Sequence, residues 1–321
     1  MTAEVTLALA GDTMLGRGVA DVLASTPDAA LFSEEIVEIA QSAGLFVLNL
    51  ECCISERGEP WPAPGKPFFF RAPPAAVDVL ARLCVDCVTL ANNHALDFGH
   101  DALLDTFGHL DRAGIKRVGA GRDLVEARAP VDIEADGVTV TVIGATDHPN
   151  DYEARADAPG VALAEFRDRV PKWLTDAVAG ASGDVVLVTP HWGPNMTSEP
   201  LPEIRRAARS LTNAGASLVA GHSAHVFHGV TRRVLYDLGD FIDDYAIDPI
   251  LRNDLGLLWL VTVTRDGPKE VKGIPLKLEY CYTRRAVGED ARWIETRFRR
   301  ACAVFNTDIE WRNGGLRVLF S

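Results

Sequence analysis

Short apolar runs, most of them ending at a polar residue, recur along the chain from its first ten residues onward. They are too short for stable helices and are rich in Val and Leu, a pattern that predicts buried strands. In chain order, the predicted strands cover residues 5–10, 45–50, 87–90, 130–134, 138–144, 184–189, 217–220, 232–237, 257–264, 271–280 and 316–320.

Segments in which apolar residues recur every three or four positions separate many of these strands, and that spacing predicts amphipathic helices. Strands that alternate with helices predict an α/β fold with helices on both faces of a sheet. Asp136 and Gly137 predict a hairpin, so the sheet is expected to be mixed. Pro171 is expected to break or restart one helix. The predicted helices cover residues 31–42, 75–83, 101–113, 163–178, 203–214 and 289–304, while residues 19–30 fit a helix or a loop.

One long segment fits neither pattern. Residues 55–74 contain six prolines and predict an irregular loop of the kind that often forms a lid or a binding wall. Lys66 and Arg71 are predicted to bind an anionic substrate group such as a carboxylate. Trp61 and the three phenylalanines at 68–70 leave two interpretations open, because they suit either an aromatic or peptide substrate or an anchor to the core.

The composition is that of an ordinary globular protein. The chain has 321 residues, 47% hydrophobic and 24% charged, which is enough for one large domain. We find no internal boundary, and we expect a single domain over residues 1–321, with residues from about 255 to 321 as a C-terminal strand and helix extension. Cys84 and Cys87 form the only CxxC pair among six cysteines. A zinc ribbon needs two such pairs, so the cysteines are interpreted as small core residues.

Charge and hydropathy narrow the range of partners. A net charge of −13 argues against nucleic acid or an anionic membrane as the main partner. The first residues lack the basic start of a signal peptide, and no apolar run reaches the roughly 18 residues that a spanning helix needs. We therefore expect a cytoplasmic protein that acts on a small molecule or a peptide.

Residue types that bind metal ions follow many of the predicted strands. In open α/β sheets, ligands bind at the carboxyl ends of strands, where distant parts of the chain converge. One histidine after a strand is more often structural, and one aspartate after glycine is often a turn residue. Coincidence at five strand ends is a poorer explanation, so the sequence predicts a divalent-metal site at one rim. The residues of metal-binding type that follow predicted strands are Asp12, Asn49, Glu51, Asn93, His94, His191, His222, His225 and Asp240.

The same positions resemble the CapA family, which is named for poly-γ-glutamate capsule synthesis and is similar to the calcineurin-like metallophosphoesterases. The matching motifs are Gly11–Leu15, Asn49–Glu51, Ala91–Asp97, His191–Gly193, Gly221–His225 and Leu238–Phe241. The resemblance spans nearly the whole chain. It implies a four-layer α/β/β/α sandwich of two mixed sheets flanked by helices, with the metal site at one rim.

The resemblance also implies roles for individual residues. It implies one or two divalent ions (Mn, Zn, Fe, Mg or Ca) with His94 near the leaving group. Three positions depart from the calcineurin pattern: Met14 replaces a histidine, Glu51 stands where a bridging aspartate is usual, and the Gly221–His225 motif is one residue longer. A thioether is a poor ligand for such ions, so a single ion is at least as well supported as a pair. The implied ligands are Asp12, Glu51, Asn93, His191, His222 and His225.

Three functions remain open at this stage. The first is a metal-dependent hydrolase of a phosphoester, peptide or γ-glutamyl amide bond, with a metal-activated water and His94 as acid. The second is a metal-dependent epimerase that exchanges a Cα proton, since CapA-like proteins include one that acts on a lasso-peptide precursor. The third is a non-catalytic factor in capsule-polymer assembly. For the two enzymes, the predicted catalytic residues are Asp12, His94, Asp97 and His148, and Trp192 is a further predicted substrate contact.

Overall fold

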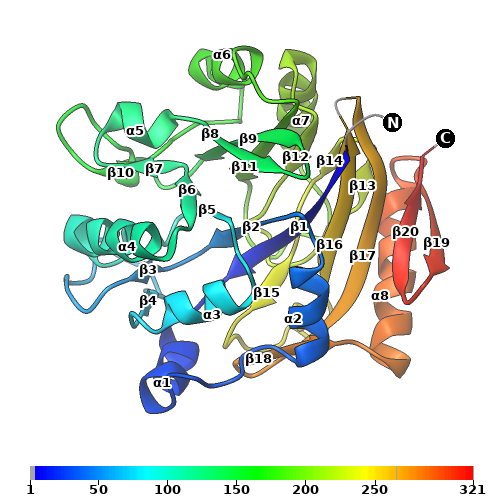
Figure 1. The fold of residues 1–321 in the computed structure, drawn as a ribbon, viewed down its shortest axis with the longest axis horizontal. Helices are drawn as coiled ribbons and strands as arrows, with labels where there is room; N and C mark the ends of the chain where they lie inside the picture. The colour runs from blue at the N-terminus through cyan, green and yellow to red at the C-terminus, as the bar shows by residue number, and fades with distance from the viewer. Residues whose placement is uncertain (1–3, 265, 321) are drawn as a thin grey trace.

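The computed structural model describes residues 4–264 and 266–320. Two large sheets pack face to face, and helices cover the outer face of each (Figure 1). Both sheets contain parallel and antiparallel pairs. The predicted four-layer α/β/β/α sandwich with mixed sheets is therefore confirmed.

The first sheet has ten strands, in the order β19-β20-β17-β16-β1-β2-β5-β6, with β15 paired to β1 and β18 paired to β17. The strands β1, β2, β5 and β6 are parallel, whereas β16 and β17 run antiparallel to their neighbours. Their bounds are β1 Glu4–Thr13, β2 Leu45–Leu50, β5 Cys87–Thr89, β6 Lys116–Val118, β15 Asp240–Ile242, β16 Leu255–Thr264, β17 Gly267–Glu279, β18 Tyr282–Arg285, β19 Asp308–Arg312 and β20 Gly315–Leu319.

The second sheet has six strands, in the order β13-β14-β12-β11-β9-β8. The predicted hairpin is its β8–β9 pair, and Asp136 and Gly137 at its turn have φ of 51° and 75°, as a type I′ turn requires. The bounds are β8 Val131–Ala135, β9 Val138–Thr146, β11 Val185–His191, β12 Leu218–Ala220, β13 Val230–Thr231 and β14 Val234–Leu235. Two small pairs stand apart: β3 Cys53–Ile54 with β4 Arg71–Ala72, and β7 Ala120–Gly121 with β10 Gly160–Val161.

Alternation along the strands produces the layers. In β1, Leu7 and Leu9 face the core between the sheets, while Ala8 and Ala10 face the outer helices. Helices α1 to α4 pack on that outer face, α6 and α7 pack on the second sheet, and α8 closes one end of the core between the sheets. The helices are α1 Arg17–Ser25, α2 Glu34–Gln41, α3 Ala76–Arg82, α4 Gly99–Ala113, α5 Leu124–Arg128, η1 Asn150–Tyr152, α6 Lys172–Ala179, α7 Pro202–Ala214 and α8 Gly288–Ala303.

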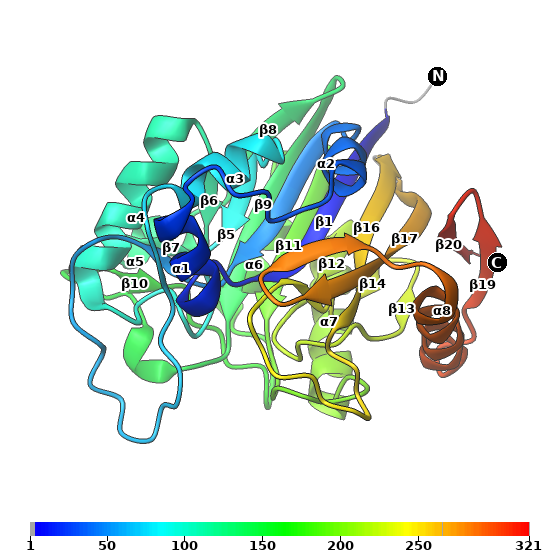
Figure 2. The same cartoon turned by 90° about the horizontal axis from the view of Figure 1, so that it is seen from below.

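The segment from Leu255 onward contributes to the main sheet. Strand β16 pairs with β1 over six positions, from Glu4–Thr264 to Leu9–Trp259, and β17 extends the same sheet. Strand β1 therefore lies in the interior of the sheet, between β2 and β16. Only the last part of the segment expected as a C-terminal extension lies at one end of the molecule. This part consists of α8, β19 and β20, and it lies opposite the long loop 55–70 (Figure 2).

The structure corrects one predicted helix. Residues 163–170 are not helical, and α6 begins only at Lys172, after Pro171. The backbone here bonds to β9 instead, since the Ala164 amide donates to Thr146, and a residue before proline disfavours the helical region. Five cysteines are buried core residues, whereas Cys84 is exposed. Across residues 4–264 and 266–320, no helix combines the length and apolar character needed to cross a membrane.

Candidate metal centre

The strand register brings the predicted ligands to one rim. Asp12, near the end of β1, lies beside Asn49 of β2 on one side and Asp240 of β15 on the other. In the second sheet, His191 ends β11 and forms a bridge with His222, which follows β12. At this rim, the first sheet therefore contributes the carboxylates of Asp12 and Asp240, and the second sheet contributes the imidazoles of His191 and His222.

Two groups of three side chains within the described residues have the geometry of a metal site. One consists of Asp12, His191 and His222, and the other of Asp12, His225 and Asp240. In each group the potential ligand atoms lie within 4.8 Å of one another, and all three side chains are buried. Asp12 belongs to both groups, so this carboxylate can serve two neighbouring cation positions.

Asp12 is held by donors on every side. Its Oδ1 accepts a hydrogen bond from Asn49 Nδ2 at 2.7 Å, and its Oδ2 accepts one from the Ser223 amide at 3.3 Å. His225 Nδ1 lies 3.2 Å from Asp12 Oδ2 and 2.9 Å from Asp240 Oδ1. Burial raises the pKa of Asp12, but the hydrogen bond and charge of His225 outweigh burial and lower it. Asp12 is therefore an ionised carboxylate with a fixed orientation.

The histidines of the first group are neutral. His191 Nδ1 lies 3.0 Å from His222 Nδ1, and both rings are buried. Burial lowers the pKa of both, to about 4 for His222. Neutral imidazole is the form that binds Zn, Mn or Fe, so these two rings are ready ligands at neutral pH.

His225 behaves differently because it lies between two carboxylates. Burial lowers its pKa, but the charge of Asp240 and the hydrogen bonds with Asp12 and Asp240 raise it well above the usual range. The imidazolium form supplies positive charge at the place where the second group would hold a cation. A cation bound there would replace that proton.

Several buried polar atoms of the rim have no hydrogen-bond partner among the described residues. A buried, unpaired carboxylate is costly, and burial raises the pKa of Glu51 and Asp240 well above the usual range. A divalent cation would satisfy these atoms, and oxygen with imidazole nitrogen is a donor set that suits Mn, Zn or Fe. The residues present therefore fit a metal ion. The unpaired atoms are Glu51 Oε1 and Oε2, Asn93 Oδ1, His222 Nε2 and Asp240 Oδ2.

A buried His–Asp pair lies next to this cluster. His94 Nδ1 is 2.6 Å from Asp97 Oδ2, and His94 Nε2 lies 3.9 Å from Glu51 Oε1. Asp97 also accepts hydrogen bonds from the Phe70 amide and the Tyr152 hydroxyl, and it pairs with Lys66 Nζ at 2.5 Å. Burial lowers the pKa of His94 despite the neighbouring Asp97 carboxylate. Lys66, predicted to bind a substrate anion, instead holds Asp97.

A second His–Asp pair lies on the opposite sheet and is more open. His148 Nδ1 contacts Asp147, whose other oxygen accepts a hydrogen bond from the Gly193 amide at 3.0 Å. The His148 ring lies 5.3 Å from the His191 ring and lines a pocket of about 590 Å³. Asn195 lines the same pocket and contacts His225 Nε2 at 3.1 Å. This pocket therefore reaches the rim of the cluster.

Two predicted substrate contacts do not reach the cluster. Trp192 is 3% exposed, packs against Phe166 and donates from Nε1 to the Tyr236 carbonyl, so it belongs to the core outside the second sheet. Successive strand residues face opposite sides, which is why His191 faces the centre and Trp192 does not. Arg71 donates to the carbonyls of Arg57 and Gly58.

The long loop contributes packing as well as exposed surface. Phe70 is fully buried and meets the His94 ring edge-on, with ring centroids 4.3 Å apart. Phe68 is 48% exposed. Met14, at the position where a calcineurin-type histidine would stand, is buried among apolar residues under the helices. The thioether is thus a packing group.

The sequence matches a known protein family over most of its length. Residues 6–245 match the family described as bacterial capsule synthesis protein PGA_cap. The chain belongs to this family. The matched range contains every residue of the candidate centre, from Asp12 to Asp240.

Individual proteins are also similar to this chain in sequence or in structure. A probable polyglutamine synthesis accessory protein of Mycobacterium tuberculosis is 30% identical, with 97% of this chain and 95% of the relative covered. The PGA biosynthesis protein CapA of Bacillus subtilis is 28% identical over 73% of this chain and 62% of its own length. A crystal structure of a hypothetical protein from Thermus thermophilus matches with a TM-score of 0.51 at 14% identity. It covers 85% of this chain and 99% of that chain, and it supports the fold alone.

Two side chains of the cluster were identified at strand ends in the sequence but were not among the implied ligands. Asp240 completes the second group, and Asn49 positions Asp12. The only sequence signal for Asp240 and Asn49 was that each is a polar residue at the end of a predicted strand or in a motif that matches the family. Their role depends on the parallel pairing of β1 with β15 and β2, which the sequence does not reveal.

Proposed function

We propose that this protein is a metal-dependent hydrolase that cleaves a phosphoester or γ-glutamyl amide bond at the rim centre. The observation that carries this proposal is the position of Asp12, which is shared by two three-ligand groups beside the His94–Asp97 pair. Shared carboxylate ligands suit a pair of cations that act together on one bond. The proposed ligands are Asp12, Glu51, Asn93, His191, His222, His225 and Asp240.

A bound cation would polarise the oxygen of the scissile bond and lower the pKa of water. The protein's own groups would handle the leaving-group proton. Asp97 accepts from His94 Nδ1–H, so the neutral ring keeps Nε2, on the side of Glu51, free to take the proton of the attacking water and to pass it to the leaving group as the acid. Lys66 and Tyr152 fix the Asp97 carboxylate and thereby the ring. Water supplies the hydroxyl group to one fragment, and the proton that it loses reaches the leaving group through His94, so the ring ends the cycle neutral.

The names of the relatives favour the amide over the phosphoester. They refer to polyglutamine synthesis and to PGA biosynthesis. A γ-glutamyl chain presents one carboxylate per residue beside each amide bond. The net charge of −13 repels such a polymer at long range, so recognition would depend on local cations close to the centre.

A second candidate function is supported by one specific observation. Two His–Asp pairs, His94–Asp97 and His148–Asp147, lie at different sheets beside the same cluster. An epimerase needs one group that removes a Cα proton and another that returns a proton on the opposite face. The third candidate, a non-catalytic factor in capsule-polymer assembly, would use the centre only as a structural metal site.

The first experiment measures metal and reaction together. Metal per chain is determined by mass spectrometry for the wild type and for His222→Ala. The wild type is then assayed with p-nitrophenyl phosphate, bis-p-nitrophenyl phosphate and a γ-glutamyl oligomer, and with a peptide in deuterated water. We expect bound metal in the wild type, less metal in His222→Ala, and release of phosphate or glutamate.

Each outcome separates the candidates. Deuterium at Cα without cleavage would replace hydrolysis by epimerisation. Bound metal with neither cleavage nor exchange would favour the assembly role. Full metal content in His222→Ala would remove His222 from the ligand set. Loss of one of three ligands must weaken metal binding.

A further inference from the structure

One arginine near the centre, Arg17, is flanked by three aromatic rings, and its side chain is 35% exposed. The guanidinium carbon of Arg17 lies 4.7 Å from the ring centroid of Phe68, 5.7 Å from that of Phe70 and 5.9 Å from that of Tyr245. Arg17 begins helix α1 with φ of 50°, a region that side chains other than glycine rarely adopt. The backbone therefore accepts an unfavourable conformation at this position.

The same rings connect Arg17 to the metal cluster. The Phe70 ring meets the His94 ring at a centroid distance of 4.3 Å, and the Tyr245 ring meets His225 at 5.4 Å. One aromatic ring therefore separates the guanidinium from the proposed acid, and one ring separates it from a proposed metal ligand.

The hydrogen bonds of Arg17 are incomplete. Its Nε pairs with Asp244 Oδ2 at 3.2 Å, and that oxygen also accepts from the Gly18 amide at 3.0 Å. Its Nη1 is buried and has no hydrogen-bond partner among the described residues. The Asp244 contact orients the guanidinium while leaving a buried donor unpaired, and such donors are normally satisfied in native proteins.

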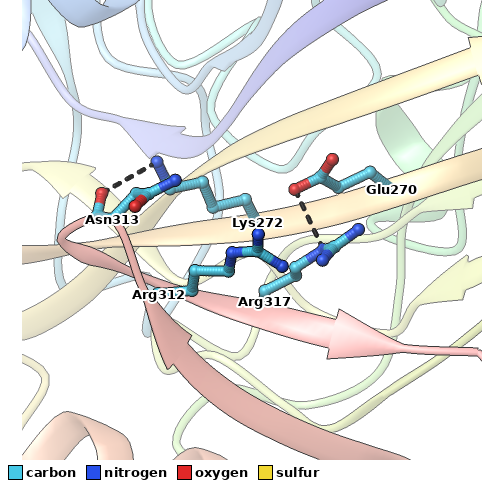
Figure 3. A pocket seen from close by; sticks show the side chains of 5 residues that line it. All are labelled: Glu270, Lys272, Arg312, Asn313 and Arg317. Atoms are coloured by element: carbon cyan, nitrogen blue, oxygen red, sulfur yellow. Dashed lines mark hydrogen bonds and ion pairs between the residues drawn. The ribbon is translucent and has the colours of Figure 1, made fainter.

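Lys66 and Arg71, the two cations predicted to bind a substrate anion, are already engaged. Lys66 is paired with Asp97, and Arg71 donates to two carbonyls. A separate cationic pocket of about 260 Å³ lies on β17, β19 and β20 (Figure 3). There Arg317 pairs with Glu270, and Lys272 donates to the Asn313 carbonyl. Arg17 therefore differs from them in combining an unpaired donor with proximity to the centre.

We propose that Arg17 binds the anionic oxygens of the substrate, either a glutamyl carboxylate or a phosphoryl group, while the scissile bond lies at the metal centre. This inference rests on the proposed function and names the substrate class for it. A guanidinium presents a planar fork that matches two oxygens of an oxyanion, and the rings of Phe70 and Tyr245 hold that plane in position. Phe68, which is half exposed, covers the guanidinium and forms the wall that a ligand would displace.

The test measures binding rather than turnover, so it does not depend on catalysis. Metal-loaded protein is titrated by calorimetry with inorganic phosphate and with tri-γ-glutamate, and metal content is checked in every variant. In Arg17→Ala, affinity for at least one anion should fall about tenfold or more. Loss for phosphate alone would identify a phosphoryl ligand, and loss for tri-γ-glutamate alone a carboxylate.

Arg128→Ala is the matched control. The Arg128 guanidinium also lies 4.7 Å from an aromatic centroid, that of Trp173, and pairs with Glu153 at 3.3 Å, but it belongs to α5. Its affinities should equal those of the wild type. Phe68→Ala removes the wall and keeps the guanidinium, and should bind at least as tightly as the wild type.

Three results would overturn the inference. One is wild-type affinity for both anions in Arg17→Ala, and another is a loss in Phe68→Ala as large as that in Arg17→Ala. The third is a wild type that binds neither anion. A wild type without any turnover, whose anion binding still depends on Arg17, would instead contradict the proposed reaction and leave the anion site in place.

Discussion

The two His–Asp pairs beside the centre differ in how tightly the protein holds them. In the His94–Asp97 pair, Asp97 is fully buried and is contacted by His94, Lys66, Tyr152 and the Phe70 amide. In the other pair, the side chains of His148 and Asp147 are 34% and 19% exposed. The first pair is fixed in orientation, whereas the second lies against a pocket that solvent and substrate can enter.

The difference in burial suits the two His–Asp pairs to different roles in proton transfer. A general acid must point at one leaving atom, which a rigid, buried pair achieves because its orientation is set during folding. An exposed pair exchanges protons with water readily but positions them less well. We therefore expect hydrolysis to depend mainly on the buried pair, and Cα proton exchange to depend on both.

The largest effect is expected from a substitution that disrupts both three-residue ligand groups at once. Asp12→Asn keeps the side-chain volume but removes the charge shared by the two ligand groups. We expect metal loss from both groups and a fall in kcat/KM of about a thousandfold or more, since metal catalysis contributes several kcal/mol. Metal content and turnover are measured together.

Asp254→Asn is the control for that variant. Asp254 is also buried, but it pairs with Arg252 and Lys277 outside the centre. It should retain the bound metal. If Asp12→Asn kept as much metal as Asp254→Asn, the two groups would not share this carboxylate.

The next effect separates the two pairs. Asp97→Asn should lower kcat by about a hundredfold or more with the metal retained, because His94 loses its orienting carboxylate. It should also destabilise the fold by about 1–3 kcal/mol, since the mostly buried Lys66 loses its charged partner. Rates are compared with the denaturation midpoint in urea. Equal kcat in Asp97→Asn and wild type would remove His94 from the role of acid.

The smallest effect is expected at the exposed pair. Asp147→Asn should lower hydrolysis by about tenfold or less, because water can replace a solvent-accessible proton carrier. In the peptide exchange assay, the same variant should lose deuterium incorporation as fully as Asp97→Asn if the protein is an epimerase. The ratio of the two losses therefore reports which reaction the pairs serve.

Much of the fold and the rim could be predicted because the signals are local. Asp12, His191 and His222 lie at or just after the carboxyl ends of apolar strands, which is where ligands bind in α/β sheets. Asp97 and His148 lie close in sequence to their partners. These features need only the chain's hydrophobic pattern and nearby residue types.

What the sequence missed depends on long-range pairing and on side-chain direction. Asp240 joins the second three-residue group because β15 pairs with β1, and Arg17 approaches the centre only through the fold of the loop that carries Phe68 and Phe70. Trp192 was predicted as a substrate contact, but successive residues of a strand face opposite sides, and Trp192 points away from the side on which His191 lies. Residues 163–170 have helical spacing, but the backbone amide of Ala164 donates to Thr146 of β9.

The pairing of β1 with β16 has a consequence for biosynthesis. Asp12 leaves the ribosome long before its strand's neighbour, Leu255–Thr264, has been made. Until then, β1 has one unpaired edge, which other strands can join. The sheet that carries Asp12 is therefore completed only after Leu255–Thr264 has been synthesised.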